Sequence, residues 1–126
     1  MRSNSVIKDR TLMKKYILLA LSALILTSCG EYNRVLKSTD PTVKLNYAKK
    51  AFEQKKYVQA TTVLGDIVDL FRGKEEAEDA LYLLALSNYE NKDYASSGVY
   101  FKNYYTRYPR GKYTELARFY CGYGYY

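Results

Sequence analysis

The sequence contains no histidine and no tryptophan, and its only cysteines are Cys29 and Cys121. Without histidine there is no base for Cys–His catalysis. Two cysteines cannot complete a tetrahedral zinc site unless carboxylates supply the other ligands, and no spacing suggests such a set. No glycine-rich loop that could cradle a phosphate is present, because Gly98 and Gly111 stand alone. The sequence therefore predicts a protein that is not an enzyme and that uses no metal and no cofactor.

The basic excess of the chain is concentrated at its start. The whole sequence has 20 Lys and Arg against 13 Asp and Glu, for a formal net charge of +7. Residues 1–28 hold five of the basic groups and one acidic group, which leaves 15 basic and 12 acidic groups in the remainder. A nucleic-acid-binding surface would instead gather its positive charge on one face. We therefore expect no nucleic-acid partner.

The N-terminal region has the pattern of a bacterial lipoprotein signal. The basic pair Lys14-Lys15 precedes an uncharged run from Tyr16 to Leu26, and small residues then lead to Cys29. The run is shorter than the roughly 20 apolar residues of a permanent membrane span, and it has the flanks of a cleaved signal. Leu26-Thr27-Ser28-Cys29 resembles a lipobox, which implies cleavage before Cys29 and lipid attachment to that residue. The alternative is an ordinary secretion signal with an incidental cysteine.

This pattern divides the chain into three parts. We expect a signal peptide over residues 1–28, with translation starting at Met13, and a lipidated N-terminus and tether over residues 29–39. The polar stretch Glu31–Thr39 carries no helical stripe. If Cys29 is acylated, Cys121 has no disulfide partner within the chain. Residues 40–126 form the third part.

Residues 40–126 carry apolar side chains at helical spacing. Asp40-Pro41 predicts a helix start, because an N-cap acceptor precedes a proline at the first helical position. Breaks follow at residues 54–56, at Gly73, at residues 91–93 and before Pro109, so that the last of five helices runs from near Tyr113 to Tyr126. The acidic run Glu75, Glu76, Glu78 and Asp79 is explained by its favourable place at a helix start rather than by a cation site.

The helices repeat with an offset of 37 residues. This offset places Lys56-Tyr57 on Asp93-Tyr94 and Leu64 on Phe101. Two helices per unit at such a period are typical of a stacked solenoid. The large-small pairs and small sites resemble those of a tetratricopeptide repeat; they are Tyr47-Ala48, Leu84-Ala85, Ala60 and Ser97. We therefore predict an all-α, tetratricopeptide-like solenoid of about two and a half repeats, approximately 41–73, 74–110 and an incomplete 111–126, as the N-terminal part of a longer product.

The lipobox, the tether and the repeats together resemble the BamD family, the lipoproteins of the outer-membrane β-barrel assembly machinery. The residues that carry this likeness are Tyr47-Ala48, Phe52, Lys56-Tyr57, Ala60, Phe101, Arg107-Tyr108-Pro109, Tyr113, Ala117 and a final Gly-Tyr-Tyr segment. The resemblance implies a lipid anchor in the outer membrane that faces the periplasm, and a non-enzymatic role in delivering and inserting β-barrel proteins. Gly30 after Cys29, with no acidic cluster following, favours the same membrane.

The resemblance also implies partners. They are a BamA-like barrel protein, other members of the assembly complex and unfolded outer-membrane β-barrel proteins. Two alternatives stay open: another periplasmic tetratricopeptide lipoprotein that serves as a scaffold in the cell envelope or in division, or the docking arm of a larger enzyme.

A second stripe in the repeats suggests a peptide-binding groove. Tyr82, Leu86 and Tyr89 lie about 100° around their helix from the apolar packing stripe. The 37-residue offset carries this stripe to Leu45, Lys49 and Phe52 and to Phe119, Tyr123 and Tyr126. In tetratricopeptide folds this face lines a concave groove, so we hypothesise an aromatic groove for a peptide with aromatic residues and a terminal carboxylate, which Lys49 would meet. The alternative is that these residues bury against the next repeat. Cys121 aligns with Leu84 and is expected to be buried and unreactive.

Overall fold

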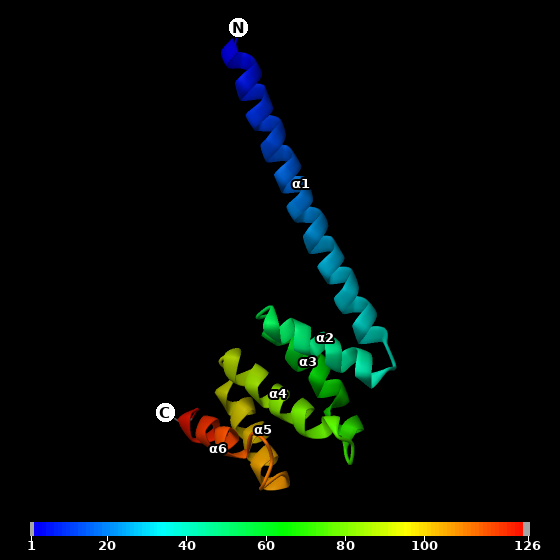
Figure 1. Ribbon diagram of the computed structural model, residues 1–126, viewed down its shortest axis with the longest axis vertical. Coiled ribbons are helices and arrows are strands. Elements are labelled where there is room, and N and C mark those ends of the chain that lie inside the picture. Colours follow the sequence, from blue (N-terminus) through cyan, green and yellow to red (C-terminus); the bar gives the residue numbers. More distant parts are fainter. Residues whose placement is uncertain (1, 125–126) are drawn as a thin grey trace. The chain divides into compact units, whose positions relative to one another are not determined.

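The computed structural model is all-α over the residues that it describes, which are 2–124 for the backbone and 9–22 and 30–124 for the side chains. Within this part there is no strand (Figure 1). The helices are α1 (Arg2–Lys37), α2 (Pro41–Glu53), α3 (Tyr57–Ile67), a 3₁₀ helix (Val68–Phe71), α4 (Glu76–Glu90), α5 (Tyr94–Arg107) and α6 (Thr114–Tyr123). The chain divides into two units, residues 1–34 and residues 35–126. The predicted all-α fold is confirmed.

The first unit consists of helix α1 up to Arg34, and the last three residues of the helix belong to the second unit. The apolar side chains of α1 over residues 9–22, including Tyr16, Leu18 and Leu19, are exposed. In the described part of the chain, no helix combines the length and the apolar character that crossing a bilayer requires. The side chain of Cys29 lies outside the described residues, so lipid attachment there stays a prediction.

The stretch after Cys29 is mostly helical, although the sequence predicted a polar tether with no helical stripe there. Helix α1 continues to Lys37, so most of Glu31–Thr39 is helical rather than irregular. The stretch contains Glu, Arg, Leu and Lys, which are good helix formers, and it has no glycine or proline to end a helix before residue 38. The expectation failed because a polar helix needs no apolar stripe when its residues favour the helix by themselves.

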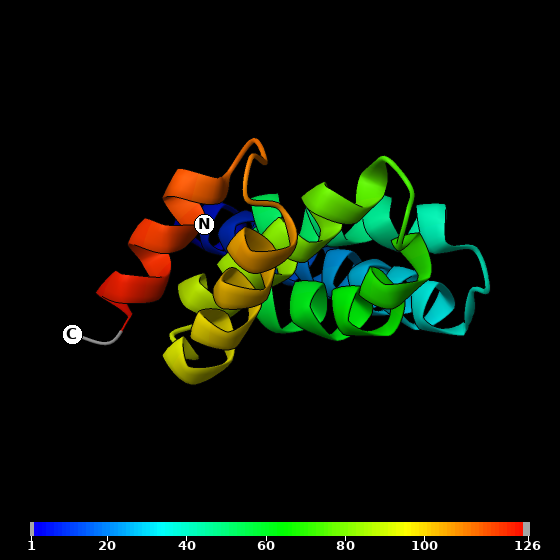
Figure 2. The ribbon, with the colours of Figure 1, turned by 90° about the horizontal axis from the view of Figure 1, so that it is seen from below.

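The second unit is a row of helices in which sequence neighbours pack side by side. Helices α2 and α3 form one hairpin and α4 and α5 form the next, with α4 packed against both α3 and α5. Helix α6 packs on α5 and lies at the end of the row (Figure 2). The boundaries follow local chemistry: the Asp40 carboxylate accepts the Thr42 backbone N–H at 2.9 Å, and the Asp93 carboxylate accepts that of Ser96 at 3.1 Å. The predicted helix start at Asp40-Pro41 is therefore confirmed.

The turns inside the two hairpins are equivalent at the 37-residue offset. In each, a lysine adopts a left-handed conformation, with φ of 60° at Lys55 and 63° at Lys92. The N–H of Lys56 reaches the carbonyl of Ala51 at 2.8 Å, and the matching bond of the second turn is 2.9 Å. Both turns are Schellman caps, with the second bond of that motif at 2.9 Å in each. The sequence repeat is thus a repeat of backbone geometry.

The core repeats as well. The small residues Ala60 and Ser97 and the bulky residues Leu64 and Phe101 are all fully buried. An edge-on aromatic pair spans each turn, Phe52–Tyr57 at 5.4 Å and Tyr89–Tyr94 at 5.3 Å between ring centroids. The tetratricopeptide label itself is not tested by these contacts and stays a prediction.

Replacing Lys92 by glycine is expected to stabilise the protein. A residue with a Cβ loses roughly 1–2 kcal/mol in the left-handed conformation, and glycine does not. Chemical denaturation of the full chain should therefore give an unfolding free energy higher by about 1 kcal/mol for Lys92→Gly.

The control is Lys102→Gly, at an exposed position inside α5. It should lower the unfolding free energy by about 1 kcal/mol, because glycine is unfavourable in a helix interior. Equal losses in the two variants would contradict the left-handed cap.

Candidate functional site

The residues predicted to line a groove fall into two groups in the structure: one group is buried or half-buried, and the other is exposed. Leu45 is buried, with 3% of its surface exposed, and therefore offers nothing to a peptide. Phe52 is half-buried and contacts Tyr57. Tyr82, Leu86 and Tyr89 are half-buried and pack against the core between α4, α5 and α6.

The contacts of Tyr82 and Tyr89 agree with the alternative interpretation, that they pack on the next repeat. The ring of Tyr82 stacks on that of Tyr113, with centroids 4.1 Å apart and planes at 13°. The ring of Tyr89 meets that of Tyr120 of α6 at 4.8 Å. Both tyrosines therefore join the second repeat to the third. Replacing either one would disturb this packing, so the replacement would not test peptide binding alone.

The remaining groove candidates are exposed. Lys49 lies on α2, whereas Phe119 and Tyr123 lie on α6, each with 60% of its surface exposed. The rings of Phe119 and Tyr123 stack on each other at 5.7 Å and 16°. Tyr126 lies outside the described residues. A continuous row of exposed groove residues is thus absent from the described part, and the exposed aromatic groove candidates within it, Phe119 and Tyr123, both lie on α6.

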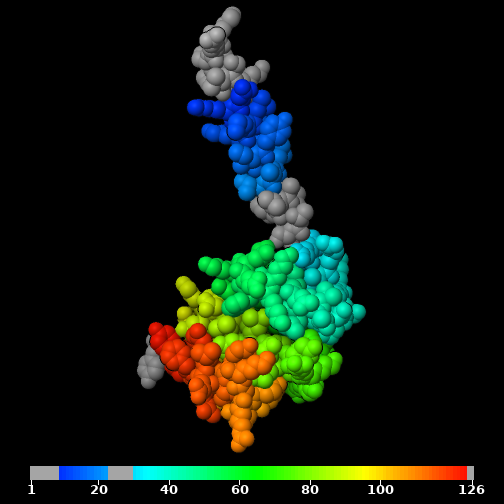
Figure 3. Space-filling model, viewed as in Figure 1, coloured from blue at the N-terminus to red at the C-terminus, as the bar shows by residue number. Residues whose placement is uncertain are grey.

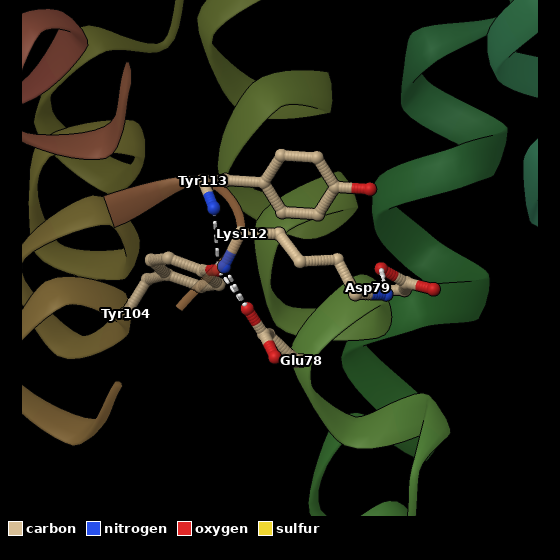
Figure 4. Close-up of polar contacts among 5 residues, drawn as sticks. All are labelled: Glu78, Asp79, Tyr104, Lys112 and Tyr113. Atoms are coloured by element: carbon tan, nitrogen blue, oxygen red, sulfur yellow. Dashed lines mark hydrogen bonds and ion pairs between the residues drawn. The ribbon is translucent and has the colours of Figure 1, made fainter. Parts of the chain in front are cut away.

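A hydrogen-bond network centred on Glu78 fixes the position of the turn before α6 (Figure 4). We call it the Glu78 network; its members are Glu78, Asp79, Tyr104, Lys112 and Tyr113. The carboxylate of Glu78, in the first turn of α4, accepts the hydroxyl of Tyr104 at 2.5 Å and the backbone N–H of Lys112 at 2.6 Å. The hydroxyl of Tyr104 in turn accepts the backbone N–H of Tyr113 at 3.0 Å.

An ion pair supports this network from the side. The ammonium of Lys112 lies 3.4 Å from the carboxylate of Asp79. This carboxylate raises the pKa of Lys112. Burial raises the pKa of Tyr113, and the neighbouring carboxylate of Asp79 raises it further. Lys112, in the turn between α5 and α6, therefore contacts two adjacent residues at the start of α4, Glu78 and Asp79.

Tyr104 is the buried centre of the network. Its side chain is fully buried, and desolvation is the main reason that the pKa of its hydroxyl lies well above the ordinary value of 10.0. The hydrogen bond to Glu78 raises this pKa further. The hydroxyl therefore stays protonated and keeps donating to Glu78 throughout the neutral range.

Gly111 lets the turn approach this network. A Cβ atom at residue 111 would lie 2.6 Å from the Glu78 carboxylate oxygen, 2.7 Å from the Tyr104 hydroxyl and 2.9 Å from Cβ of Tyr108. These distances are shorter than any ordinary contact, so a side chain here would push the turn away. The glycine that looked isolated in the sequence is required by close packing.

The network is a departure from the repeat. Shifting Glu78, Tyr104 and Gly111 back by 37 residues gives Pro41, Ile67 and Lys74, which cannot form these bonds. The interpretation of the acidic run as a helix-start cluster was therefore incomplete, because Glu78 and Asp79 also bind residues more than 30 positions away. Polar residues that break an otherwise regular repeat were the signal that could have revealed this.

A surface cavity of about 330 Å³ lies beside the same turn. Three basic residues line it, Arg110, Lys112 and Arg118, together with the single acidic residue Glu115. Arg118 also lies over the ring of Tyr105, 5.7 Å from its centroid. Leu116 and Arg118 of α6 thus form part of the wall of this basic cavity.

The remaining candidate groups are the thiol of Cys121 and the side chains that could bind a metal ion. Cys121 is buried, as predicted, and its thiol lies 3.6 Å from the carbonyl oxygen of Gly98. Within the described residues, no three His, Cys, Asp or Glu side chains lie close enough together to hold a metal ion.

No family model matches the chain, and a search of curated proteins finds no match to its sequence.

The Gly111→Ala variant is expected to destabilise the protein by about 2 kcal/mol, because overpacking typically costs 1–3 kcal/mol. The measurement is the unfolding free energy of the full chain in denaturant. Gly65→Ala is the matched control, since nothing lies within 4 Å of a Cβ at Gly65 in α3. The control should gain about 1 kcal/mol from helix propensity. A Gly111→Ala protein as stable as this control would contradict the Glu78 network.

Proposed function

We propose that this chain is a lipid-anchored, non-enzymatic repeat module of the outer-membrane β-barrel assembly machinery, of the BamD type. Its anchor is Cys29, its helical body faces the periplasm, and its partners are a BamA-like barrel protein, other members of the complex and unfolded β-barrel proteins. The observation that carries the proposal is the repetition of one hairpin geometry directly after a lipobox sequence. The caps at Lys55 and Lys92, 37 residues apart, are that repetition.

Stacked hairpins bury their apolar faces against one another and expose extended surfaces to partners, as helical-repeat proteins do in general. In the described body, Tyr104 and Glu78 are engaged in packing and hydrogen bonds between repeats. Exposed aromatic and basic side chains remain at α6. This arrangement supports protein binding better than it supports covalent chemistry.

The anchor supports a role at a membrane. A cysteine acylated on its sulfur and on its new amine carries several chains, and several chains together anchor a protein stably where a single chain does not. The body would then be held at the surface where β-barrel proteins are inserted. Two alternatives, an envelope or division scaffold and the docking arm of a larger enzyme, predict different partners.

The first test of the proposal is the Cys29→Ser variant in the native cell. The wild-type protein is expected to fractionate with the outer membrane and to incorporate labelled fatty acid, and Cys29→Ser is expected to lose both properties. Cys121→Ser is the matched control, because this buried thiol is not the predicted attachment site, and it should keep both. An unlabelled wild-type protein would overturn the anchor.

The second test is affinity capture of the full-length, lipidated protein after crosslinking in the cell. Recovery of a BamA-like barrel protein together with nascent β-barrel proteins is the expected result. Recovery of wall-synthesis or division proteins in their place would favour the scaffold alternative and remove the assembly role.

A further inference from the structure

The positive charge of the helical body is concentrated in the first repeat. Residues 41–56 hold five lysines and one acidic residue, whereas residues 57–126 hold eight basic and nine acidic residues. Lys44 is engaged in the fold, because the ammonium of its mostly buried side chain lies 3.7 Å from the carboxylate of Asp66. The other four lysines lie at the end of α2 and in the turn that follows it, and we call them the lysine edge; they are Lys49, Lys50, Lys55 and Lys56.

The lysine edge lies at the surface of the body. Lys49, Lys50 and Lys55 are exposed, and Lys56 is half-buried. The turn between α2 and α3 stands at the margin of the row of helices in Figure 1, and its green surface projects from the body in Figure 3. The exposed lysines therefore present positive charge to solvent at the end of one helical hairpin.

The second repeat lacks this charge at the equivalent positions. The 37-residue offset matches the four lysines with Leu86, Ser87, Lys92 and Asp93. Helix α4 has no basic residue in its last turn, yet it ends in the same Schellman cap as α2. The left-handed position of this cap favours glycine rather than lysine. The fold therefore does not require the lysine edge.

Along the chain, the lysine edge belongs to the repeat that follows the proposed lipid anchor. Pro41, at the start of α2, comes 12 residues after Cys29, and even a fully extended chain of that length spans only about 40 Å. An acylated Cys29 would thus hold the first repeat close to the membrane. Acyl chains and a basic patch are two signals that together anchor a protein more stably than either one alone.

The chemistry of the lysine edge favours lipid headgroups over a protein as its partner. The edge has four lysines and no arginine, whereas protein interfaces are enriched in arginine and aromatic residues and depleted in lysine. The lysine ammonium is a flexible point charge. Anionic lipids attract such charges within about a Debye length of the membrane, and this attraction needs no shaped pocket.

We propose that the lysine edge binds the anionic headgroups of the membrane to which Cys29 attaches the chain, so that the first repeat lies against the lipid surface. This inference rests on the anchor of the proposed function and adds a second contact with the membrane. It does not depend on which proteins the other repeats bind.

Vesicle binding of the full chain tests this proposal. All proteins carry Cys29→Ser, so that no acyl chain contributes, and the vesicles contain phosphatidylcholine alone or with about 30% phosphatidylglycerol as the anionic lipid. The test variant is Lys49→Gln/Lys55→Gln. The matched control, Lys74→Gln/Lys102→Gln, removes the same charge from two exposed positions outside the lysine edge. A third variant, Lys49→Arg/Lys55→Arg, keeps the charge.

The unsubstituted lysine edge is expected to give a clear preference for the anionic vesicles. Lys49→Gln/Lys55→Gln should lower this preference about tenfold or more, because one lysine near an anionic surface changes the partition coefficient by about fivefold. The control pair should change it by less than about twofold, and the arginine pair should keep it. Salt at about 0.5 M should remove it by screening. Helicity measured by circular dichroism should be equal in all variants.

Other results overturn the proposal. Equal binding to neutral and anionic vesicles, or a loss in the arginine pair, would contradict an electrostatic contact with headgroups. An equal loss in the control pair would assign the preference to net charge alone, and a preference kept by both glutamine pairs would assign it to the basic residues of 1–28. A missing fatty-acid label in the cell would count against the lipid anchor, whereas these vesicle results would count against the lysine edge only.

Discussion

The carboxylate of Glu78 is the contact on which the end of the repeat stack depends. It accepts hydrogen bonds from a side chain 26 residues away and from a backbone amide 34 residues away, so it joins the start of α4 to α5 and to the turn before α6. Long-range bonds of this kind offset the entropy of closing the intervening chain. The position of the turn before α6 follows from this joint.

Burial decides which side chains are left for partners. Tyr82 and Tyr89 would suit a binding groove by composition, but their rings contact Tyr113 and Tyr120 and hold the second repeat to the third. The aromatic residues at equivalent positions of α6 have no such cover in the described part of the chain. The same stripe thus packs between repeats in α4, whereas Phe119 and Tyr123 of α6 are each 60% exposed in the described part of the chain.

Much of the fold was predictable because local chemistry and the repeat agree. Asp40-Pro41 predicted a helix start, and the 37-residue offset predicted equivalent turns at Lys55 and Lys92. The helical stretch before Lys37 was missed, since the absence of an apolar stripe does not prevent a helix. The Glu78 network was missed for a different reason: periodicity reports what repeats, and this network consists of residues that do not repeat. Which aromatic residues are covered depends on neighbouring helices and cannot be read from one helix alone.

The most direct test of this account compares the pH dependence of unfolding of the wild-type full chain with that of Tyr104→Phe. Native Tyr104 keeps its proton above its ordinary pKa of 10.0, whereas the unfolded chain releases it, so the native state binds more protons and this contribution to stability falls as pH rises. The wild-type protein should be the more stable one at neutral pH, and its advantage should shrink above about pH 10 by up to about 1.4 kcal/mol per pH unit. No advantage at neutral pH, or an advantage that stays constant to about pH 11, would contradict a buried hydroxyl bonded to Glu78.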